Sequence, residues 1–538
     1  MLSSAEVRMN KMTKNVLEWL EATAAQYGSE SAFLDTKEEI TFEEVMSHAK
    51  AIGSAIAEHA ISAVTPTEVN PLGAAAPIAV IAGRNVHTPA AYLGVVYSGR
   101  PYAPIDAKLP EQRILKILST LQPAAVLVDE ENRGVVEELV KDFIAGSHIT
   151  REIPILTMEE LLQHPVNQPA LDQIRSRMSV TDPLYLIFTS GSTGNPKGVI
   201  TSHMSLMCYI NAYSKVMGIA HTDRLGNQSP LDYIAAIRDI YLPMKHGCST
   251  LIIPKEYFME PDNLFDCMNQ YHVTSVGWSV SALTVPLSLG AFEDTGLTSL
   301  KKICFSGSVM PCKCLRVWQQ HLPEAKFVNQ YGPTEATASC TYYEVDHVVD
   351  EDEVLPIGTA YENYKVFLMN EDCTPTPAGQ EGEICVSGPI LALGYYNDPG
   401  RTADSFIQNP LNPFYQERIY RTGDIGVFRE DGILEFHGRK DRQIKHMGHR
   451  VELDEVEYAA NQIDGVAESC CIYRKDKETL FLFYTGETAS RDVVLELRQV
   501  LPGFMVPRKV KALDTMPKLP NGKIDMNALR NMTERRGK

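Results

Sequence analysis

The stretch from Leu186 to Gly198 reads LIFTSGSTGNPKG. Its apolar start predicts a buried strand, and the glycines, small hydroxyl residues and lysine that follow predict a loop at the end of that strand. Glycine tolerates the backbone dihedrals that let several N–H groups point at one centre, so such a loop can bind a polyphosphate. A polar surface loop without a ligand is the alternative, because Gly-rich loops are common in turns. The candidate donors are Thr189, Ser190, Gly191, Ser192, Thr193, Gly194 and Lys197.

The loop is not a P-loop, because Lys197 precedes Gly198 and no hydroxyl residue follows in the required place. The phosphate prediction therefore depends on other segments of the chain. NQYGPTEAT (329–337) offers Tyr331 to stack on a base and Glu335 to hold a divalent metal against phosphate oxygens.

Three more residues downstream have side chains that suit a nucleotide. Asp424 in YRTGD is placed to accept hydrogen bonds from ribose hydroxyls, and Arg439 in HGRKD offers a fork for phosphate or hydroxyl. Lys523 in LPNGKID is presented on an Asn-Gly turn. Taken singly, each has an ordinary alternative as a turn residue, a solvated charge or a loop residue.

The rest of the chain predicts α/β architecture. Short apolar runs end in Gly, Ser, Asp or Pro and are followed by helical periodicity, as expected of buried strands. These runs are PIAVIAG (77–83), AAVLVD (124–129), LYLIFTS (184–190), STLIIP (249–254), KKICFSG (301–307) and GEICVSG (382–388). We expect residues 62–76 to form a surface loop.

At 538 residues the chain is too long for one compact core, so we expect at least two domains. Asp431-Gly432 lies between two alternating runs and predicts a β-hairpin. The tail beyond it has helix, strand and helix patterns of its own. The predicted domains are a large one over 1–440 and a small α+β one over 441–538.

Composition limits the possible functions. The net charge of −18 disfavours nucleic acid and anionic membranes as partners. We find no signal peptide and no apolar run of the ~18–20 residues that a membrane span needs. The eleven cysteines are scattered without the paired clusters of a zinc site, which predicts free thiols in a reducing cytoplasm.

Together the motifs resemble the adenylate-forming superfamily of acyl-CoA synthetases, luciferases and adenylation domains of nonribosomal peptide synthetases. TSGSTGNPKG, NQYGPTEAT, YRTGDIG, GRKDRQIKHMGHRVELDEVE and LPNGKID occur in order at family-like separations. The resemblance implies a large N-terminal domain of stacked α/β subdomains with a distorted β-barrel, and a small mobile α+β C-terminal domain.

The resemblance also implies the chemistry and its cofactors, ATP and Mg²⁺. A carboxylate and ATP give acyl-AMP and pyrophosphate, and a thiol then takes the acyl group. Lys523 and Glu335 would be catalytic, with Glu335 as the metal ligand. Asp441 would be a hinge about which the C-terminal domain rotates, so that either Lys523 or the face from Lys445 to Glu452 meets the site. The nucleotide-binding set would be the seven loop residues with Asn329, Gln330, Tyr331, Gly332, Pro333, Thr334, Asp424 and Arg439.

Within the superfamily the chain is most similar to the amino-acid-activating branch, including D-alanine–carrier-protein ligases. There an aspartate pairs with the substrate ammonium, and Asp232 in SPLDYIAAIRDIYLPMKHG is the candidate, with a turn or helix-capping role as the alternative. The implied amino-acid pocket is Asp232, Tyr233, Ala236, Gly277, Cys304, Ser306, Gln330, Ala338, Ser339 and Lys523.

The pocket residues favour a neutral amino acid of medium or large size. Ala236 and Gly277 leave space, whereas Tyr233 and the nearby Trp278 disfavour a cationic side chain. Ser306 and Ser308 depart from the D-alanine ligase pattern, so D-alanine is an alternative. A CoA ligase for a small carboxylic acid is another.

The expected acceptor is the phosphopantetheine thiol of a separate carrier protein. The sequence ends fifteen residues after Lys523, whereas a carrier domain needs roughly 80 residues. We therefore expect a stand-alone adenylating enzyme.

Overall fold

The computed structural model describes residues 13–59, 76–147, 152–191, 194–293, 295–519 and 523–534. The predicted loop at 62–76 falls almost wholly outside these ranges, as do Ser192 and Thr193 of the candidate phosphate loop.

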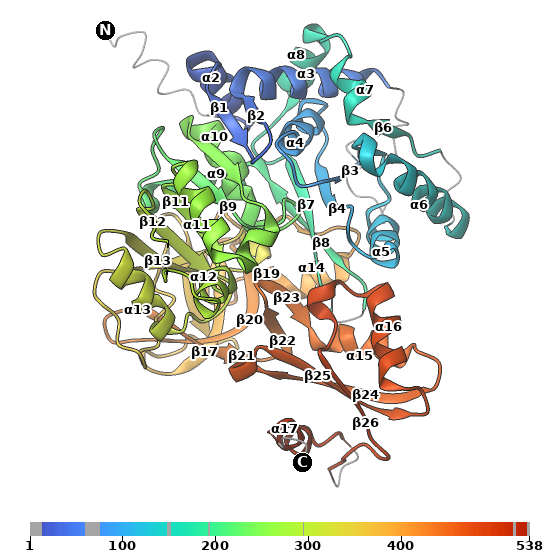
Figure 1. Ribbon diagram of the computed structural model, residues 1–538, viewed down its shortest axis with the longest axis vertical. Helices are drawn as coiled ribbons and strands as arrows, with labels where there is room; N and C mark the ends of the chain where they lie inside the picture. Colours follow the sequence, from blue (N-terminus) through green and yellow to red (C-terminus); the bar gives the residue numbers. More distant parts are fainter. Residues whose placement is uncertain are drawn as a thin grey trace.

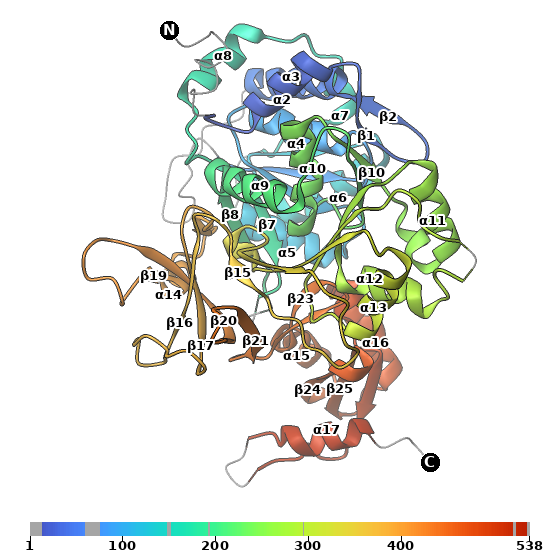
Figure 2. The same ribbon diagram turned by 90° about the vertical axis from the view of Figure 1, so that its left-hand side faces the viewer.

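Two large mixed sheets form the body of the molecule (Figures 1 and 2). The nine-stranded sheet has the order β15 (Thr359–Ala360), β14 (Thr341–Val345), β13 (Lys326–Tyr331), β12 (Lys302–Ser306), β11 (Ser275–Ser279), β9 (Arg224–Asn227), β10 (Ser249–Ile252), β1 (Ser31–Leu34) and β2 (Glu39–Thr41). The seven-stranded sheet has the order β18 (Gly394–Tyr395), β8 (Lys197–Ser202), β7 (Pro183–Thr189), β4 (Tyr102–Asp106), β3 (Ile78–Ala82), β5 (Ala125–Val128) and β6 (Ile155–Thr157).

The central strands of both sheets are parallel and buried. All five residues of β3 are buried, which explains why this strand is a continuous apolar run rather than an alternating one. The predicted strands at 77–83, 124–129, 184–190, 249–254, 301–307 and 382–388 all form, and the α/β fold class is confirmed.

The largest core cluster lies where helices pack between the two sheets. It joins side chains of β1 and β3, which belong to different sheets, with side chains of several helices. These are α3 (Phe42–Glu58), α4 (Thr88–Tyr97), α9 (His203–Met217) and α10 (Ile237–His246). The remaining helices of this part are α2 (Leu17–Tyr27), α5 (Glu111–Leu121), α6 (Arg133–Gly146), α7 (Met158–Leu162), α8 (Gln168–Arg177), α11 (Pro261–Gln270), α12 (Val280–Ser288), α13 (Cys312–His321) and α14 (Pro399–Ser405).

A third, antiparallel sheet holds five strands. They are β16 (Lys365–Met369), β17 (Glu381–Ser387), β20 (Arg418–Phe428), β19 (Phe406–Gln408) and β21 (Leu434–Arg439). The predicted hairpin joins β20 to β21, and Gly432 in its turn has a φ of 79°, a conformation that suits glycine.

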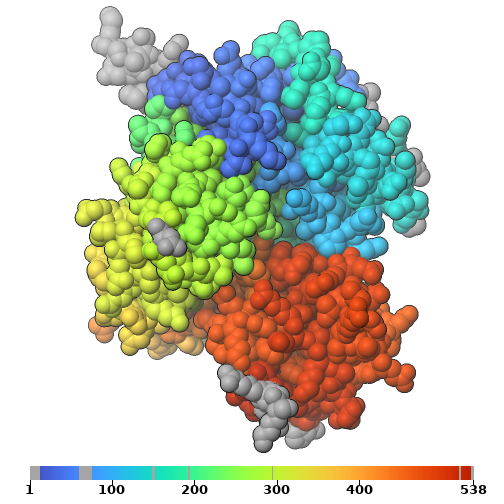
Figure 3. All heavy atoms as spheres, in the orientation of Figure 1, coloured from blue at the N-terminus to red at the C-terminus, as the bar shows by residue number. Residues whose placement is uncertain are grey.

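The chain changes sheet after β21 and forms a smaller C-terminal region below the body (Figure 3). Its elements are β22 (Gln443–His446), β23 (His449–Glu452), α15 (Leu453–Asn461), β24 (Val466–Arg474), β25 (Thr479–Gly486), α16 (Ser490–Val500), β26 (Lys509–Ala512) and α17 (Met526–Glu534). A separate core cluster, which includes Val456, Leu482 and Leu497, packs this region. The domain boundary near residue 440 stays a prediction that agrees with this change of sheet.

Candidate active site

The candidate phosphate loop begins where β7 ends. Thr189 is buried, and its Oγ1 has no hydrogen-bond partner. The Ser190 hydroxyl donates to the carbonyl of Arg450 at 2.9 Å, and the backbone N–H of Gly191 donates to Glu455 Oε2 at 3.2 Å. The loop therefore presents donors to a negatively charged group, and a carboxylate of the C-terminal region takes one of them.

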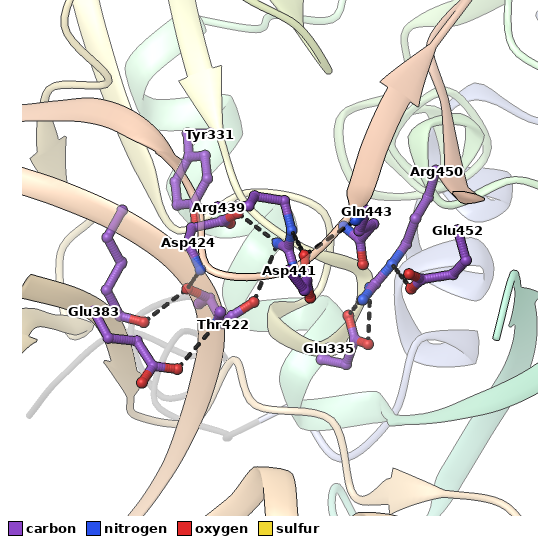
Figure 4. Close-up of polar contacts among 12 residues, drawn as sticks. Tyr331, Glu335, Glu383, Thr422, Asp424, Arg439, Asp441, Gln443, Arg450 and Glu452 are labelled. Carbon is purple, nitrogen blue, oxygen red and sulfur yellow. Dashed lines mark hydrogen bonds and ion pairs between the residues drawn. The ribbon is translucent and has the colours of Figure 1, made fainter. Parts of the chain in front are cut away.

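Glu335 lies in a short 3-10 turn, η5 (Thr334–Ala336), just after β13, and its side chain is fully buried. Its carboxylate accepts from Lys197 Nζ at 3.0 Å and from the Tyr395 hydroxyl at 2.7 Å. It also accepts from Arg450 Nη1 at 2.9 and 3.0 Å (Figure 4). Burial alone would raise the pKa of Glu335, but Arg450 and then Lys197 hold that pKa well below its usual range. The side chain is therefore an anion with three donors around it.

Mg²⁺ fits this site only through Glu335. No group of three or more His, Cys, Asp and Glu residues suitable for a metal occurs within the described ranges. Mg²⁺ commonly binds one or two carboxylates together with substrate phosphates and water, so one buried carboxylate is sufficient beside a polyphosphate. In the present arrangement Arg450 contacts both oxygens of that carboxylate.

A second polar cluster lies at the hairpin of the antiparallel sheet (Figure 4). Asp424 on β20 accepts hydrogen bonds from the Tyr331 hydroxyl and from Arg439 Nη1. Arg439 also binds both oxygens of Asp441, at 2.6 and 2.7 Å. The Arg439 guanidinium, the predicted phosphate ligand, thus links Asp424, the predicted ribose acceptor, to Asp441, the predicted hinge residue.

The Asp424–Arg439–Asp441 cluster and Arg450 line a cavity of about 500 Å³ between the body and the C-terminal region, whereas Thr189, Ser190, Gly191, Gly194, Lys197 and Glu335 are not among its lining residues. It is lined by many of the residues that the sequence indicated: Tyr233, Ser306, Asn329, Gln330, Tyr331, Gly332, Pro333, Thr334, Ala338, Ser339, Asp424, Arg439 and Asp441. The segments come from across the chain, and the fold brings them to one place.

Asp232 does not line the cavity, contrary to the expectation for an ammonium partner. Residues 230–233 form a tight turn in which the N–H of Tyr233 donates to the carbonyl of Pro230. The turn sends neighbouring side chains in different directions: Tyr233 faces the cavity, whereas Asp232 accepts from the backbone N–H of Asp106 at 3.3 Å. Burial, and then the Asp106 carboxylate, raise the pKa of Asp232 to about 7.

Three other residues of the expected amino-acid pocket also lie off the cavity surface. Ala236 and Cys304 are buried in the core, at 0% and 1% exposure. The space beside Gly277 is filled by Arg238, because a Cβ on this glycine would lie 2.1 Å from Arg238 Nε. Gly277 therefore makes room for a protein side chain, and its space is not evidence for a large substrate.

Arg238 is the residue that the sequence analysis missed. It lies on α10, lines the cavity and is 2% exposed. The available signal was its position in SPLDYIAAIRDIYLPMKHG, where the charged pair Arg238-Asp239 interrupts a mostly apolar stretch. Arg113, Tyr395 and Glu455 were also missed as members of the site, because their contacts join distant segments.

Lys523 does not line the cavity. It is exposed, and its carbonyl accepts from the N–H of Leu519 at 2.7 Å. The helix α17, which begins three residues later, lies at the outer end of the C-terminal region in both views (Figures 1 and 2).

The C-terminal region instead turns its β22–β23 hairpin toward the cavity. Lys445, Gly448 and Arg450 line it, and the Tyr233 hydroxyl donates to the carbonyl of Gly448 at 3.0 Å. Of the two expected orientations, this arrangement corresponds to the one in which Lys523 is withdrawn and the face from Lys445 to Glu452 meets the site.

Comparison with known proteins identifies the class. The family model described as AMP-binding enzyme matches residues 20–396, and the model of the AMP-binding enzyme C-terminal domain matches residues 455–523. The chain belongs to the AMP-binding enzyme family, and its relatives are AMP-forming ligases.

The particular relatives include two synthases and a D-alanine–D-alanyl carrier protein ligase. The chain is 30% identical over 457 residues to tyrocidine synthase 1 of Brevibacillus parabrevis, covering 84% of this chain and 40% of that protein. It is 28% identical to the D-alanine–D-alanyl carrier protein ligase of Bacillus cereus, covering 96% of this chain and 98% of that ligase. The chain thus spans less than half of the tyrocidine synthase and 8% of bacitracin synthase 1 of Bacillus licheniformis.

Solved structures support the same fold. The Vibrio cholerae adenylation domain AlmE, in complex with glycyl-adenosine-5'-phosphate, matches with a TM-score of 0.81 at 21% identity, covering 97% of this chain and 98% of that one. The fused adenylation–PCP protein NpsA-ThdA from Klebsiella oxytoca matches with a TM-score of 0.76 at 20% identity, covering 93% and 94%.

The remaining predictions from composition concern the cysteines, membrane spans and the location in the cell. All eleven cysteines are free thiols. None of the helices in the described part of the chain has the length and hydropathy of a membrane span. The cytoplasmic location stays a prediction.

Proposed function

We propose that this protein is an AMP-forming ligase that activates an amino acid as aminoacyl-AMP, releases pyrophosphate and then transfers the aminoacyl group to the thiol of a carrier protein. The observation that carries this proposal is the set of contacts that links Thr189, Glu335 and Asp424. Lys197, the strand partner of Thr189, donates to Glu335, and Arg450 binds Glu335 and lines one cavity together with Asp424. Thr189, Glu335 and Asp424 each come from a different sheet or connection, and each offers a group that suits a different part of ATP.

The chain's own residues would divide the first step among them. Asp424, held by Tyr331 and Arg439, would orient the ribose, since a fixed carboxylate accepts from two hydroxyls without reorganising. The loop after β7 would hold the terminal phosphates through Thr189 and its backbone N–H groups. Glu335 would bind Mg²⁺, which neutralises phosphate charge when present.

Lys523 would act in this first step only after the C-terminal region rotates about Asp441. Its ammonium would lie between the attacking carboxylate and the α-phosphate, where it lowers the repulsion between two anions and fixes their approach. The present arrangement would serve the second step, because the β22–β23 hairpin meets the cavity and Lys523 does not.

A carrier thiol is favoured as the acceptor by the names of two relatives. One is a ligase that acts on a D-alanyl carrier protein, and one structural neighbour is an adenylation domain fused to a PCP domain. A CoA ligase remains the alternative, since both use the same nucleotide site.

The test is ATP–pyrophosphate exchange across a panel of amino acids and simple carboxylic acids. We expect exchange with at least one amino acid, and exchange with none would refute the proposal. Mass spectrometry of reactions that contain either a phosphopantetheinylated carrier or CoA then identifies the acceptor. An acyl-CoA product without acyl carrier would favour the alternative.

A further inference from the structure

The acyl end of the cavity contains a buried cation that the proposed function has not used. Arg238 is 2% exposed and lines the cavity. One Nη2 hydrogen bond goes to the carbonyl of Gly277, and Nε has no hydrogen-bond partner. A guanidinium has five N–H donors, and a buried one that is left short of acceptors is costly.

The carboxylate beside Arg238 is that of Asp239, which also binds Asn227. In the described part of the chain its ion pair is with Asp239, whose Oδ1 lies 3.6 Å from Nε, longer than a hydrogen bond. The other oxygen of Asp239 accepts from the Asn227 amide at 2.8 Å. Asp239 therefore supplies charge to Arg238 without satisfying its donors.

A second arginine, Arg84, shares Asp239 with Arg238 but has other carboxylates near it. Arg84 acts electrostatically on Asp239, and Glu256, Asp106 and Asp35 act on Arg84. Arg84 is also hydrogen-bonded to carbonyl oxygens and to the amide oxygen of Asn227. Asp239 is thus divided between two arginines, and Arg238 is the one that lines the cavity. A buried cation with an unsatisfied donor beside a cavity favours an anionic ligand.

The local backbone is built to hold Arg238 in this place. Any side chain at position 277 would collide with the guanidinium, since a Cβ would lie 2.1 Å from Nε and 2.5 Å from Cζ. The ring of Tyr213 lies 5.9 Å from Cζ and adds a cation–π contact. The guanidinium is therefore fixed before any substrate arrives.

The cavity offers no comparable partner for a substrate cation. Of the acidic residues that line it, Asp424 and Asp441 are both bound by Arg439, and Glu478 belongs to the C-terminal region. Asp232 faces Asp106 instead. Among the described residues between 228 and 311 that line the cavity, Arg238 is the charged one.

We propose that the acid activated by this enzyme carries a second carboxylate, and that Arg238 binds this carboxylate and selects for it. The inference rests on the AMP-forming ligase activity of the proposed function, and it gives the class of acid: one with a second carboxylate, either an acidic amino acid or a simple dicarboxylic acid. The guanidinium fork matches a carboxylate with two parallel N–H donors, which a neutral amide or methyl group cannot accept equally.

The test uses exchange with matched pairs of acids: L-glutamate with L-glutamine, L-aspartate with L-asparagine, and glutarate with pentanoate. We expect the diacid of at least one pair to have a KM roughly 10- to 100-fold lower than its neutral partner, as a charged hydrogen bond would give. Activity with glutarate identifies a simple dicarboxylic acid, and activity with glutamate or aspartate alone identifies an acidic amino acid.

The variants remove or displace the guanidinium. Arg238→Met combined with Asp239→Asn deletes both charges of the pair, so that no carboxylate is left buried alone. Gly277→Ala keeps the arginine but forces it to move. Both should lose the preference for the diacid, whereas Gly226→Ala, a buried glycine on the neighbouring β9, should keep it. Thermal unfolding checks that each variant is folded.

Three results would overturn the proposal. One is a preference for the neutral member of every pair in the wild type. Another is a diacid preference that survives both variants. The third is a loss that is equal for diacids and neutral acids, which would place Arg238 at the reacting carboxylate.

Failure of the AMP-forming ligase activity gives a different result, which is no exchange with any acid. Calorimetric titration with glutamate and glutarate then tests Arg238 by itself. Binding to the wild type and not to the Arg238→Met/Asp239→Asn variant supports the assignment, and no binding to the wild type overturns it. Exchange with glutarate but with no amino acid would refute the amino-acid part of the proposed function and keep the role of Arg238.

Discussion

Arg450 donates through Nη1 to both carboxylate oxygens of Glu335, at 2.9 and 3.0 Å, across 115 positions of sequence. Close by, Glu455 of the same C-terminal region accepts from the N–H of Gly191 and from Arg113. The C-terminal region thus places a cation on the proposed metal ligand and a carboxylate on the proposed phosphate loop. Bound Mg·ATP would need Glu335 and the Gly191 N–H, which Arg450 and Glu455 occupy in this arrangement. We therefore expect the present docking of the C-terminal region and the binding of Mg·ATP to exclude each other.

Substitution of Arg450 by Gln should separate the two half-reactions. Loss of the charge-assisted Arg450–Glu335 contact should destabilise the present orientation of the C-terminal region by about 1.5–3 kcal/mol. The population of this orientation should then fall roughly 10- to 100-fold. We expect thioester formation on a carrier to slow by a similar factor while ATP–pyrophosphate exchange stays within a few-fold of wild type. Equal loss of both activities would contradict a role specific to this orientation.

Substitution of Lys523 by Ala should have the opposite pattern. Because Lys523 is absent from the cavity in this arrangement, its proposed role belongs to adenylate formation alone. We expect exchange to fall by at least about 100-fold, as when a group that stabilises developing charge is removed. Transfer from separately prepared aminoacyl-AMP should persist.

The matched control for Lys523 is Lys518→Ala, on the same C-terminal segment. Lys518 forms an exposed ion pair with Glu468 and should matter to neither step. If Lys518→Ala impaired exchange as strongly as Lys523→Ala, the loss would reflect the segment and not the ammonium.

Substitution of Thr189 by Val should weaken ATP without harming the fold. Its buried Oγ1 has no partner in the protein, so Val removes an unsatisfied group and should leave the free energy of unfolding unchanged or raise it by about 1 kcal/mol. We expect the KM for ATP to rise about 10-fold, since a hydrogen bond to phosphate is lost. Thr201→Val on β8 is the control, because its Oγ1 is also a buried atom without a hydrogen bond and Thr201 is outside the predicted nucleotide-binding set.

Substitution of Asp232 by Asn should change how stability depends on pH. The folded pKa of about 7 lies above the ordinary value of 3.8, so the folded state holds a proton that the unfolded state has released between these values. Stability of the wild type should therefore fall as pH rises through this window. Asn cannot ionise, so it should remove this part of the slope and stabilise the protein at pH 8 by about 1–3 kcal/mol.

Urea unfolding at pH 4, 6 and 8 measures this difference. Identical slopes in both proteins would show that Asp232 is not buried as a raised-pKa carboxyl. A large rise in the KM for the amino-acid substrate in the Asp232→Asn variant would instead support an ammonium-binding role for Asp232. The position of Asp232 off the cavity surface argues against that role.

Much of the fold followed from local patterns. The parallel strands are continuous apolar runs because both of their faces are covered by helices, and this property is visible in the letters themselves. Asp431-Gly432 predicted its hairpin for a similar local reason, since the turn needs a residue at positive φ. The nucleotide-type residues were found because they stand in recognisable motifs.

The acyl pocket could not be read in the same way. Asp232 and Arg238 lie six positions apart in one quoted segment, but a four-residue turn and the start of α10 direct them to different surroundings. The sequence predicted Asp232 as the residue of the acyl pocket, whereas Arg238 is the one of the two that lines the cavity. Gly277 was likewise interpreted as empty space because the guanidinium that fills it comes from another element.

By itself the sequence determined several buried strands, the β20–β21 hairpin and the family, because these depend on backbone propensities and on short contiguous motifs. Only the tertiary structure decided which charged side chain faces the acyl cavity and which C-terminal face is docked there. Those outcomes depend on the direction of side chains and on contacts between segments more than 100 residues apart, such as Arg450 with Glu335. No local pattern encodes such contacts.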